Sequence, residues 1–300
     1  MKIFITGGSG LLGQYLNRCL SGENEILTQR FANTELFGGN SLNYNNIKLD
    51  IRDSRLLEKT IKEFKPEAVV HTACYSRPEI CAELDEKEVR RLNVEVTGNI
   101  ARICFNKGIK LIYTSTDLVY DGNKGIMLNE QAEINPVTLY AQTKLEGELA
   151  ISEETDNYII LRTALMIGFG LSHAKNNFHS MFENFSKGMK SKLFYDQYRT
   201  PLGLHAAARI INGLCKMKIK GEVLNFGGSE RVSRLQIGEV LCEVAGFDKS
   251  LIEKISINDI KGLPQVPDVS MDTTKLRSLG FEQKNVRETI IEILKNRQDL

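Results

Sequence analysis

The 300-residue sequence predicts an α/β fold, a doubly wound parallel sheet with a smaller C-terminal α/β lobe. Two observations support this prediction. Apolar strand patterns alternate with helical patterns from the first residues onward, and the connections between them are short. A glycine-rich turn also joins the first strand pattern to the first helical pattern. In a sheet of this kind, ligands bind beyond the carboxyl ends of the strands.

The segment at 2–13, KIFITGGSGLLG, is typical of a buried strand, a turn and the start of a helix. Gly7 permits a tight turn, Gly10 lets the backbone approach a pyrophosphate, and Gly13 lets the helix pack closely on the strand. The free N–H groups of the helix then face the anion. Many glycine-rich turns are only turns, but this position after an N-terminal strand favours nucleotide binding. We expect the dinucleotide to be held here by Gly7, Ser9, Gly10, Leu11, Leu12 and Gly13.

Alternating elements continue along the chain. Strands are expected at 25–30, up to Asp50, and at 68–72, 110–115, 158–162 and 222–226. Helices are expected from an Asp53 cap to Phe64, over the apolar positions from Val89 to Cys104 with Gly108 as terminator, and at 139–153 and 204–216. We assign 1–163 and 201–227 to a dinucleotide-binding Rossmann domain, and 164–200 and 228–300 to a substrate-binding lobe.

Composition and charge exclude several classes of partner. The chain has 39 basic and 38 acidic residues, a net charge of +1, and no block of basic residues, which argues against nucleic acid and anionic membranes. It enters a strand at once and has no long apolar run, so we expect a cytoplasmic protein. The six cysteines and four histidines lack metal-ligand spacing, so no metal is expected. His71 ends an apolar strand and is interpreted as a hydrogen-bonded structural histidine.

The end of the second strand bears on the choice of dinucleotide. An acidic residue there binds the ribose hydroxyls of NAD, whereas an arginine accommodates the 2′-phosphate of NADP. The chain has the neutral Gln29 followed by Arg30, so NADP(H) is favoured and NAD(H) remains an alternative. Arg30 could instead be a solvated surface residue. Asp50 and Ile51, at the end of the third strand, are expected near the adenine edge, although Asp50 could equally cap the next helix.

Three side chains suggest acid-base chemistry. Tyr140 and Lys144 are four residues apart on an expected helix, so both lie on one face. A nearby lysine cation lowers the pKa of a tyrosine and makes it a usable proton donor. Thr116, just past the fifth strand, could hydrogen-bond the same carbonyl group. A chance surface pair and a turn threonine are the alternatives, but the order of these elements favours a catalytic group.

Motifs along nearly the whole chain resemble those of the extended short-chain dehydrogenase/reductase family, and most closely dTDP-4-dehydrorhamnose reductases and their sugar-nucleotide-binding relatives. These motifs are TGGSGLLG, KLDIRD, HTACYSRPEICAE, LNVEVTGNIA, STDLVYDG, NPVTLYAQTKLEGE, LRTALMIG, NNF, DQYRTP and MDTTKL. The segments STDLVYDG and YAQTKLEGE are the most specific.

The resemblance implies a role for each matching residue. Tyr140 would be the proton donor, Lys144 would hold the nicotinamide ribose, and Thr116 would orient the keto oxygen. The remaining cofactor-lining residues would be Thr72, Ala73, Tyr75, Asn93 and Thr114. Asn177, Phe178 and Arg199 would lie against the nucleotide-sugar, with Arg199 as a diphosphate partner.

The chain departs from the family pattern on the substrate side. Leu165 stands where the reductases usually carry a tryptophan, Leu202 replaces a common threonine, and Ala206 replaces a frequent aspartate. Val266 precedes Pro267 where an arginine is usual. The predicted cofactor and catalytic residues are intact, so the chemistry is better supported than the substrate.

The expected function is NADP(H)-dependent reduction of a nucleotide-activated 4-keto-6-deoxy sugar. An epimerase or dehydratase that keeps NAD bound is an alternative with the same residues. The resemblance also extends to the non-catalytic regulatory subunit of methionine adenosyltransferase, and an NADP-binding stress or redox sensor is a further alternative. A nucleotide-sugar is the expected partner. The sequence leaves the oligomeric state open, with a homodimer as one alternative.

Overall fold

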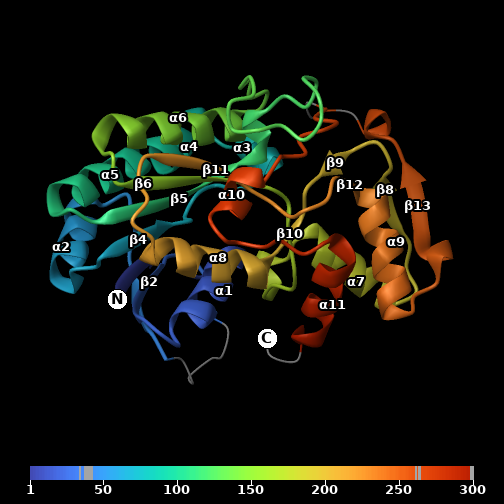
Figure 1. The fold of residues 1–300 in the computed structure, drawn as a ribbon, viewed down its shortest axis with the longest axis horizontal. Coiled ribbons are helices and arrows are strands. Elements are labelled where there is room, and N and C mark those ends of the chain that lie inside the picture. The colour runs from blue at the N-terminus through green and yellow to red at the C-terminus, as the bar shows by residue number, and fades with distance from the viewer. Residues whose placement is uncertain (34, 37–42, 261, 263–264, 298–300) are drawn as a thin grey trace. The chain divides into compact units, whose positions relative to one another are not determined.

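The computed structural model describes residues 1–33, 35–36, 43–260, 262 and 265–297, and in this part of the chain seven strands form one sheet (Figure 1). Their order across the sheet is β11, β6, β5, β4, β1, β2, β3. The pairs β1–β2, β1–β4, β2–β3 and β4–β5 are all parallel. The predicted doubly wound parallel sheet is therefore confirmed. The strands are β1 (Lys2–Thr6), β2 (Glu25–Arg30), β3 (Asn45–Lys48), β4 (Ala68–His71), β5 (Lys110–Thr116), β6 (Tyr158–Thr163) and β11 (Glu222–Phe226).

The strand order changes direction at β1. From β1 the chain proceeds outward to β2 and β3, whereas β4 returns to the opposite side of β1. The connections that follow β1 and β4 therefore leave the sheet in opposite directions. This reversal marks the point at which open α/β sheets bind their ligands, beyond the carboxyl ends of the strands.

The strands on both sides of this point are apolar along their whole length. Ile3, Phe4 and Ile5 of β1 and Val69 and Val70 of β4 are fully buried. A central parallel strand is covered by helices on both faces, so it needs a continuous apolar run instead of an alternating one. The β-branched residues also suit the extended backbone.

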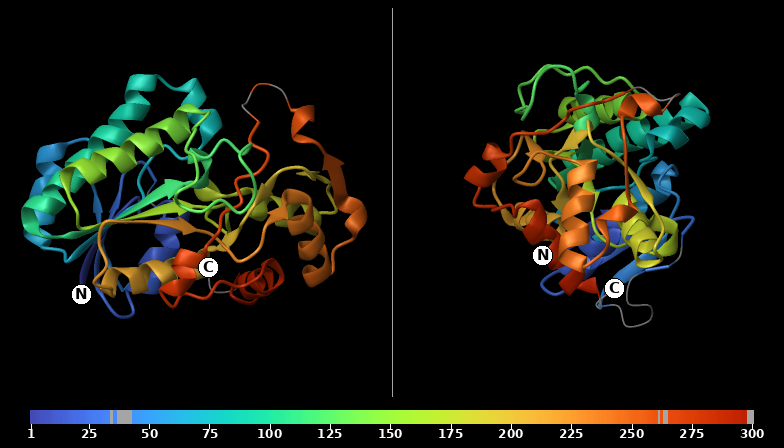
Figure 2. Two further views of the ribbon diagram at one scale, coloured as in Figure 1. Left: turned by 45° about the horizontal axis from the view of Figure 1, so that its top comes forward. Right: turned by 90° about the vertical axis from the view of Figure 1, so that its right-hand side faces the viewer.

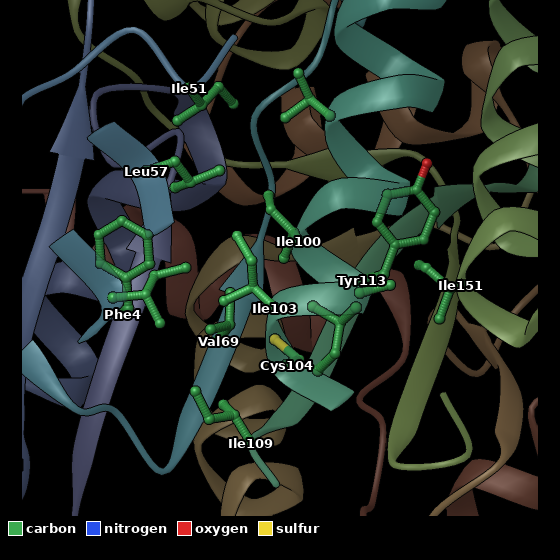
Figure 3. Close-up of a cluster of buried hydrophobic side chains, with 14 of the residues drawn as sticks. Phe4, Ile51, Leu57, Val69, Ile100, Ile103, Cys104, Ile109, Tyr113 and Ile151 are labelled. Atoms are coloured by element: carbon green, nitrogen blue, oxygen red, sulfur yellow. The ribbon is translucent and has the colours of Figure 1, made fainter. Parts of the chain in front are cut away.

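Helices cover both faces of the sheet, with α5 and α6 on one face and α1 and α8 on the other (Figures 1 and 2). On the α5 face, Ile100 and Cys104 pack with Leu57, Val69 and other residues into one apolar cluster (Figure 3). The helices that belong with this sheet are α1 (Leu11–Leu20), α2 (Ser54–Phe64), α3 (Pro78–Glu83), α4 (Glu86–Arg90), α5 (Val96–Lys107), α6 (Leu139–Glu154) and α8 (Leu204–Lys216).

Two helix ends confirm capping predictions made from the sequence. The Asp53 carboxylate accepts a hydrogen bond of 3.0 Å from the Leu56 N–H at the start of α2. Gly108 follows α5 with a positive φ of 64°, the left-handed conformation that favours glycine at a helix C-terminus. Local chemistry therefore sets where these two helices begin and end.

The helix expected from Val89 to Cys104 is divided. Its first part is α4, its last part is α5, and a π-helical turn at Arg91–Glu95 separates them. A π-helical turn inserts one extra residue per turn and rotates the side chains that follow, and such turns are frequent at functional sites. Here the turn contains the buried Asn93.

The chain divides into two compact units. The first contains residues 1–116, 138–161 and 207–223, and the second contains 117–137, 162–206 and the described part of 224–300. The second unit has its own apolar core, to which Phe178, Phe182 and Leu241 contribute. Its strands pair as β7–β10, β9–β12 and β8–β13. Among the helices described in both units, none has the length and apolar character needed to cross a lipid bilayer.

The elements of the second unit are mostly short. Its strands are β7 (Met166–Ile167), β8 (Ser191–Phe194), β9 (Tyr198–Arg199), β10 (Leu202–Gly203), β12 (Val232–Ser233) and β13 (Ile252–Ile255), and its helices are α7 (Asn177–Ser186), α9 (Arg234–Ala245), α10 (Thr274–Ser278) and α11 (Val286–Lys295). Short 3-10 turns lie at Asp117–Val119, Ser172–Ala174, Lys249–Leu251 and Ile257–Asp259.

We predict that Asp53→Ala lowers the free energy of unfolding by about 1 kcal/mol, because the first turn of α2 loses its side-chain acceptor. Urea denaturation without ligand measures this change. The control is Glu58→Ala, an exposed position on the same helix, which should change stability by less than about 0.5 kcal/mol. Equal losses in the two variants would contradict the capping role.

Candidate active site

The glycine turn after β1 is built on close backbone contacts. Gly7 has a φ of 72°, and a Cβ atom there would lie 2.8 Å from the backbone nitrogen of Ala73. A Cβ at Gly13 would lie 2.2 Å from the carbonyl oxygen of Gly7. Gly10 precedes α1 and provides no side-chain cap, so the first N–H groups of the helix are directed beyond the turn. This arrangement suits a phosphate.

Sequence reasoning missed two residues that hold this turn. A Cβ at Gly8 would lie 1.7 Å from Oγ1 of Thr28, so only glycine fits, and the Gly8 N–H donates to the Gln29 carbonyl at 2.8 Å. The buried Gln29 amide accepts from the Gly7 N–H at 2.9 Å and donates to the Leu49 carbonyl at 2.6 Å. Gln29 therefore fastens the turn to the end of β3. The double glycine and the neutral amide at position 29 are the only sequence signals of this contact.

Two polar side chains of α1 donate hydrogen bonds to backbone carbonyls of the same turn. The side-chain amide of Gln14 donates to the Ser9 carbonyl at 3.2 Å, and that of Asn17 donates to the Gly8 carbonyl at 2.9 Å. Ser9 is buried, whereas Leu11 and Leu12, at the start of α1, are half-buried. The predicted cofactor residues of this segment thus lie together on one rigid turn.

The predicted residues at the ends of β2 and β3 already have partners in the chain. Arg30 donates through Nε to the Asn46 side chain at 2.9 Å. The Arg52 guanidinium binds Asp50 through Nε at 2.9 Å and Nη2 at 2.8 Å, and this pairing lowers the pKa of the Asp50 carboxyl. Asp50 does not cap α2, because Asp53 does. Ile51 is buried in the apolar cluster under α2 and α5.

The turn after β4 is tied to the helix that carries Tyr140. The Asn93 side chain accepts from the Tyr75 N–H at 2.9 Å and donates to the Tyr75 carbonyl at 3.1 Å. It also donates to Oγ1 of Thr143 on α6 at 3.0 Å. At the start of the same turn, Thr72 donates through Oγ1 to the Thr6 carbonyl at 2.7 Å. Thus Asn93 fixes this turn, including Ala73, relative to α6.

Thr116, Tyr140 and Lys144 are buried in the same unit as the glycine turn. The Thr138 hydroxyl accepts from the Ala141 N–H at 3.2 Å, so α6 begins at Leu139 and Tyr140 lies in its first turn. Burial, followed by the neighbouring Cys74, raises the pKa of Tyr140. The Lys144 cation and a hydrogen bond with Thr116 act in the opposite direction. Lys144 and Thr116 are therefore close enough to Tyr140 to affect its pKa, so the three predicted catalytic residues lie together.

Lys144 is only 1% exposed and rests on an aromatic ring. Its Nζ atom lies 4.1 Å from the ring centroid of Tyr113, which partly replaces the water that the cation loses. A Cβ at Gly147, one turn further along α6, would lie 2.5 Å from the Tyr113 hydroxyl oxygen. The glycine therefore allows α6 to approach β5 closely enough for this contact.

His71 supports the same ring from the neighbouring strand. Its ring centroid lies 5.6 Å from that of Tyr113, and its Nδ1 and Nε2 atoms lie 2.7 Å and 3.0 Å from Oγ1 of Thr6 and of Thr97. Burial, and secondarily the Lys144 cation, lowers the pKa of His71 to about 3. The interpretation of His71 as a hydrogen-bonded structural residue is confirmed. Thr114, on the next strand, donates to the His71 carbonyl at 3.3 Å.

Of the predicted substrate residues, Asn177, Phe178 and Arg199 lie in the second unit, whereas Thr116 lies in the first. Arg199 is buried, pairs with Asp117 at 3.6 Å and donates to the Val266 carbonyl at 3.3 Å. Phe178 is buried beside Phe169, with ring centroids 5.8 Å apart, and Asn177 is exposed at the start of α7. Thus Arg199 and Phe178 contribute to the packing of this unit.

The same unit contains two arginines that sequence reasoning did not select. Arg231 lies 3.5 Å from the ring centroid of Tyr198 and pairs with Asp268 at 2.6 Å. Burial, and secondarily the like charge of Arg199, lowers the pKa of Arg234 to about 10. In the described residues of both units, no three histidine, cysteine, aspartate or glutamate residues are arranged to hold a metal ion.

The Rossmann sheet, the glycine turn after β1 and the positions of Thr116, Tyr140 and Lys144 on β5 and α6 agree with the arrangement expected of an extended short-chain dehydrogenase/reductase. The family model described as RmlD substrate binding domain matches residues 1–298, and the chain belongs to this family. The predicted family resemblance is thereby confirmed.

Curated relatives include both an enzyme and a subunit of another enzyme. Methionine adenosyltransferase 2 subunit beta of Mus musculus is 25% identical over 297 residues, which are 97% of this chain and 86% of the relative. The "Probable low-salt glycan biosynthesis reductase Agl14" of Haloferax volcanii is 27% identical over 262 residues, which are 87% and 85% of the two chains.

Solved structures with the same fold include complexes with NADP and complexes with NAD. The dTDP-4-dehydrorhamnose reductase of Bacillus anthracis, in complex with NADP, has a TM-score of 0.84 and 20% identity and covers 98% of this chain and 99% of its own. The Bordetella bronchiseptica enzyme WbmG, in complex with NAD, has a TM-score of 0.84 and 25% identity and covers 99% and 94%.

We predict that Gln29→Leu destabilises the protein by roughly 2 kcal/mol or more, because the buried Leu49 carbonyl and Gly7 N–H lose their partner. Urea denaturation without dinucleotide measures the loss. Arg30→Met, at the adjacent half-buried position, is the control and should change stability by about 0.5 kcal/mol or less. Unchanged stability of Gln29→Leu would mean that the Gln29 side chain does not form these hydrogen bonds with Gly7 and Leu49.

We also predict that His71 makes stability depend on pH. The pKa of His71 is lowered in the folded state, so its stabilising contribution is complete above the unfolded pKa of about 6.5 and is lost as the pH falls. Between about pH 6.5 and pH 5, the wild type should lose roughly 2 kcal/mol more than His71→Asn. Urea denaturation of both proteins across this range measures the difference, and parallel pH profiles would contradict the prediction.

Proposed function

We propose that the chain is an NADP(H)-dependent reductase of a nucleotide-activated 4-keto-6-deoxy sugar. The observation that carries the proposal is the buried group of Thr116, Tyr140 and Lys144, in one unit with the glycine turn. Membership of the RmlD substrate binding domain family supports the substrate class. The proposal includes a nucleotide-sugar as partner and a cytoplasmic location.

The chain's own residues fit a dinucleotide. The turn at Gly7–Gly10 and the uncapped start of α1 suit its pyrophosphate, because a side chain at Gly10 would stand in the way. The end of β2 has no acid to bind the ribose hydroxyls, and Arg30 is half-buried there with a cationic fork, which favours NADP(H) over NAD(H). When bound, the reduced nicotinamide supplies the hydride for the sugar carbonyl.

Tyr140 then supplies the proton to the keto oxygen. Its raised pKa keeps the phenol protonated at neutral pH, as a proton donor requires. The Lys144 cation and the Thr116 hydroxyl stabilise the phenolate that forms when the proton leaves. Before the proton is transferred, the single hydroxyl proton of Thr116 is donated to the keto oxygen instead, and Lys144 holds the nicotinamide ribose.

In the second unit, we propose that Asn177, Phe178 and Arg199 lie against the nucleotide-sugar. Arg199 already shares its charge with Asp117, so it would contribute less to a diphosphate than a free guanidinium would. Leu165 is half-buried and is an apolar residue in place of the usual aromatic platform. The sugar specificity should therefore differ from that of the rhamnose enzymes.

A second candidate is a non-catalytic, NADP-binding regulatory subunit. It is favoured by the similarity to methionine adenosyltransferase 2 subunit beta, which covers 97% of the chain for the mouse protein. The intact Thr116, Tyr140 and Lys144 do not decide between the two functions, because site residues can persist after turnover is lost. An epimerase or dehydratase would instead retain NAD through purification.

We predict that Tyr140→Phe lowers kcat by at least about a hundredfold, because the phenol that donates the proton is lost. The dissociation constant for NADPH should stay within about twofold. Turnover is followed by the absorbance of NADPH with a panel of nucleotide-activated 4-keto sugars, and binding by calorimetry. Tyr158→Phe, a half-buried tyrosine on β6, is the matched control and should keep normal activity.

Near-normal turnover in Tyr140→Phe would refute the assigned mechanism. No oxidation of NADPH with any sugar, together with co-purification of a methionine adenosyltransferase, would decide for the regulatory subunit.

A further inference from the structure

An arginine-centred cluster lies at the carboxyl ends of β2 and β3. It consists of Arg52, the carboxylates of Asp50 and Glu88, and the ring of Phe31, and we call it the Arg52 cluster. Arg52 binds Asp50 through Nε and Nη2, and it pairs with Glu88 through Nη1. Its Cζ atom lies over the Phe31 ring, 5.5 Å from the centroid. Two loops and helix α4 therefore meet at one guanidinium.

Asp50 and Glu88 contact the edge of the Arg52 guanidinium, so the two faces of its plane remain available for stacking. Hydrogen bonds from a guanidinium lie in its plane, and the bidentate contact with Asp50 fixes the orientation of that plane. Phe31 backs one face. The side chain of Arg52 is 25% exposed and Phe31 is 44% exposed, so the cluster is reachable from solvent.

Tyr75 extends the cluster to the turn after β4. Its hydroxyl donates to the Glu88 carboxylate, and burial, followed by Glu88, raises its pKa. Tyr75 is itself held by Asn93, which reaches α6. The orientation of Arg52 is thus set by a continuous chain of contacts within the first unit.

The position of the cluster suggests which part of a dinucleotide it meets. In this fold the ribose of the adenosine lies at the end of β2, and we placed the adenine edge at the end of β3. The Asp50 carboxylate, which sequence reasoning assigned to adenine, accepts instead from the Arg52 side chain and the Arg52 backbone N–H. The group at these strand ends that can stack on a flat base is therefore the planar guanidinium of Arg52.

We propose that the adenine ring of the dinucleotide stacks on the guanidinium of Arg52, with Phe31 behind it and with Asp50 and Glu88 as positioning residues. The inference rests on the proposed dinucleotide cofactor. Arginine stacks on base faces through cation–π and dispersion contacts. Because adenine is common to NADPH and NADH, Arg52 contributes equally to both, whereas Arg30 acts only on the 2′-phosphate.

The test measures dissociation constants of the full chain for NADPH and NADH by calorimetry. Arg52→Met should weaken both by about tenfold and leave their ratio unchanged. Arg52→Lys should weaken both nearly as much, because the ammonium keeps the charge but has no plane. Glu88→Gln should weaken both by about threefold, since Arg52 loses one of its two anchors. Arg30→Met should change the ratio only.

Arg91→Met is the matched control, because Arg91 is an exposed cation that also acts on Asp50 but has no place in the stack. It should bind both dinucleotides as the wild type does. Thermal unfolding of each variant confirms that it is folded. If Arg52→Met does not fold, the affinities of Glu88→Gln for the two dinucleotides still test the proposal.

Three outcomes would overturn the inference. Arg52→Met could bind like the wild type, it could change the NADPH to NADH ratio, which would assign Arg52 to the 2′-phosphate, or Arg52→Lys could retain full affinity, which would make charge sufficient. A wild type that binds neither dinucleotide would instead refute the proposed function.

Discussion

Direct packing of backbone on backbone at the turn between β1 and α1 is the constraint on which the first unit depends. Gly7, Gly8 and Gly13 have no room for a Cβ atom, because the atoms that a side chain would meet are a peptide nitrogen, a threonine side chain and a carbonyl oxygen. Gln29 then fastens this turn to the end of β3. Contacts within the chain therefore determine the shape of this turn, and the amides at the start of α1 are placed to face an anion.

A row of side chains across the sheet connects this turn to the proposed chemistry. Thr6 of β1 is in register with His71 of β4, and His71 is in register with Tyr113 of β5. The three are in contact, and the Lys144 cation lies on the ring at the end of the row. A disturbance at any of these positions should therefore reach Lys144 through packed, buried groups.

The sequence predicts the parts of the fold and site that local chemistry determines. The bounds of β2, α8 and β11, the Asp53 cap and the Gly108 terminus follow from periodicity and capping, and the structure confirms them. Gly8, Gln29 and the Arg52–Glu88 pair could not be found in this way. Their partners are distant in the chain, and Glu88 reaches Arg52 across 36 positions. The π-helical turn at Arg91–Glu95 leaves no mark in an apolar period of three to four residues, so one continuous helix was the natural prediction.

The burial of Tyr140 and Lys144 reconciles two demands that oppose each other. In the proposed function, Tyr140 must keep its proton until the carbonyl is reduced, and burial raises the pKa of Tyr140, which is the direction that this role needs. The same donor must then release the proton, which requires a cation and a hydrogen-bond donor at the phenolate. Lys144 and Thr116 provide them, but a buried cation is itself costly. The Tyr113 ring under Lys144 lowers that cost without neutralising the charge, which an acidic partner would do. An aromatic support thus leaves the field of the Lys144 cation available to Tyr140.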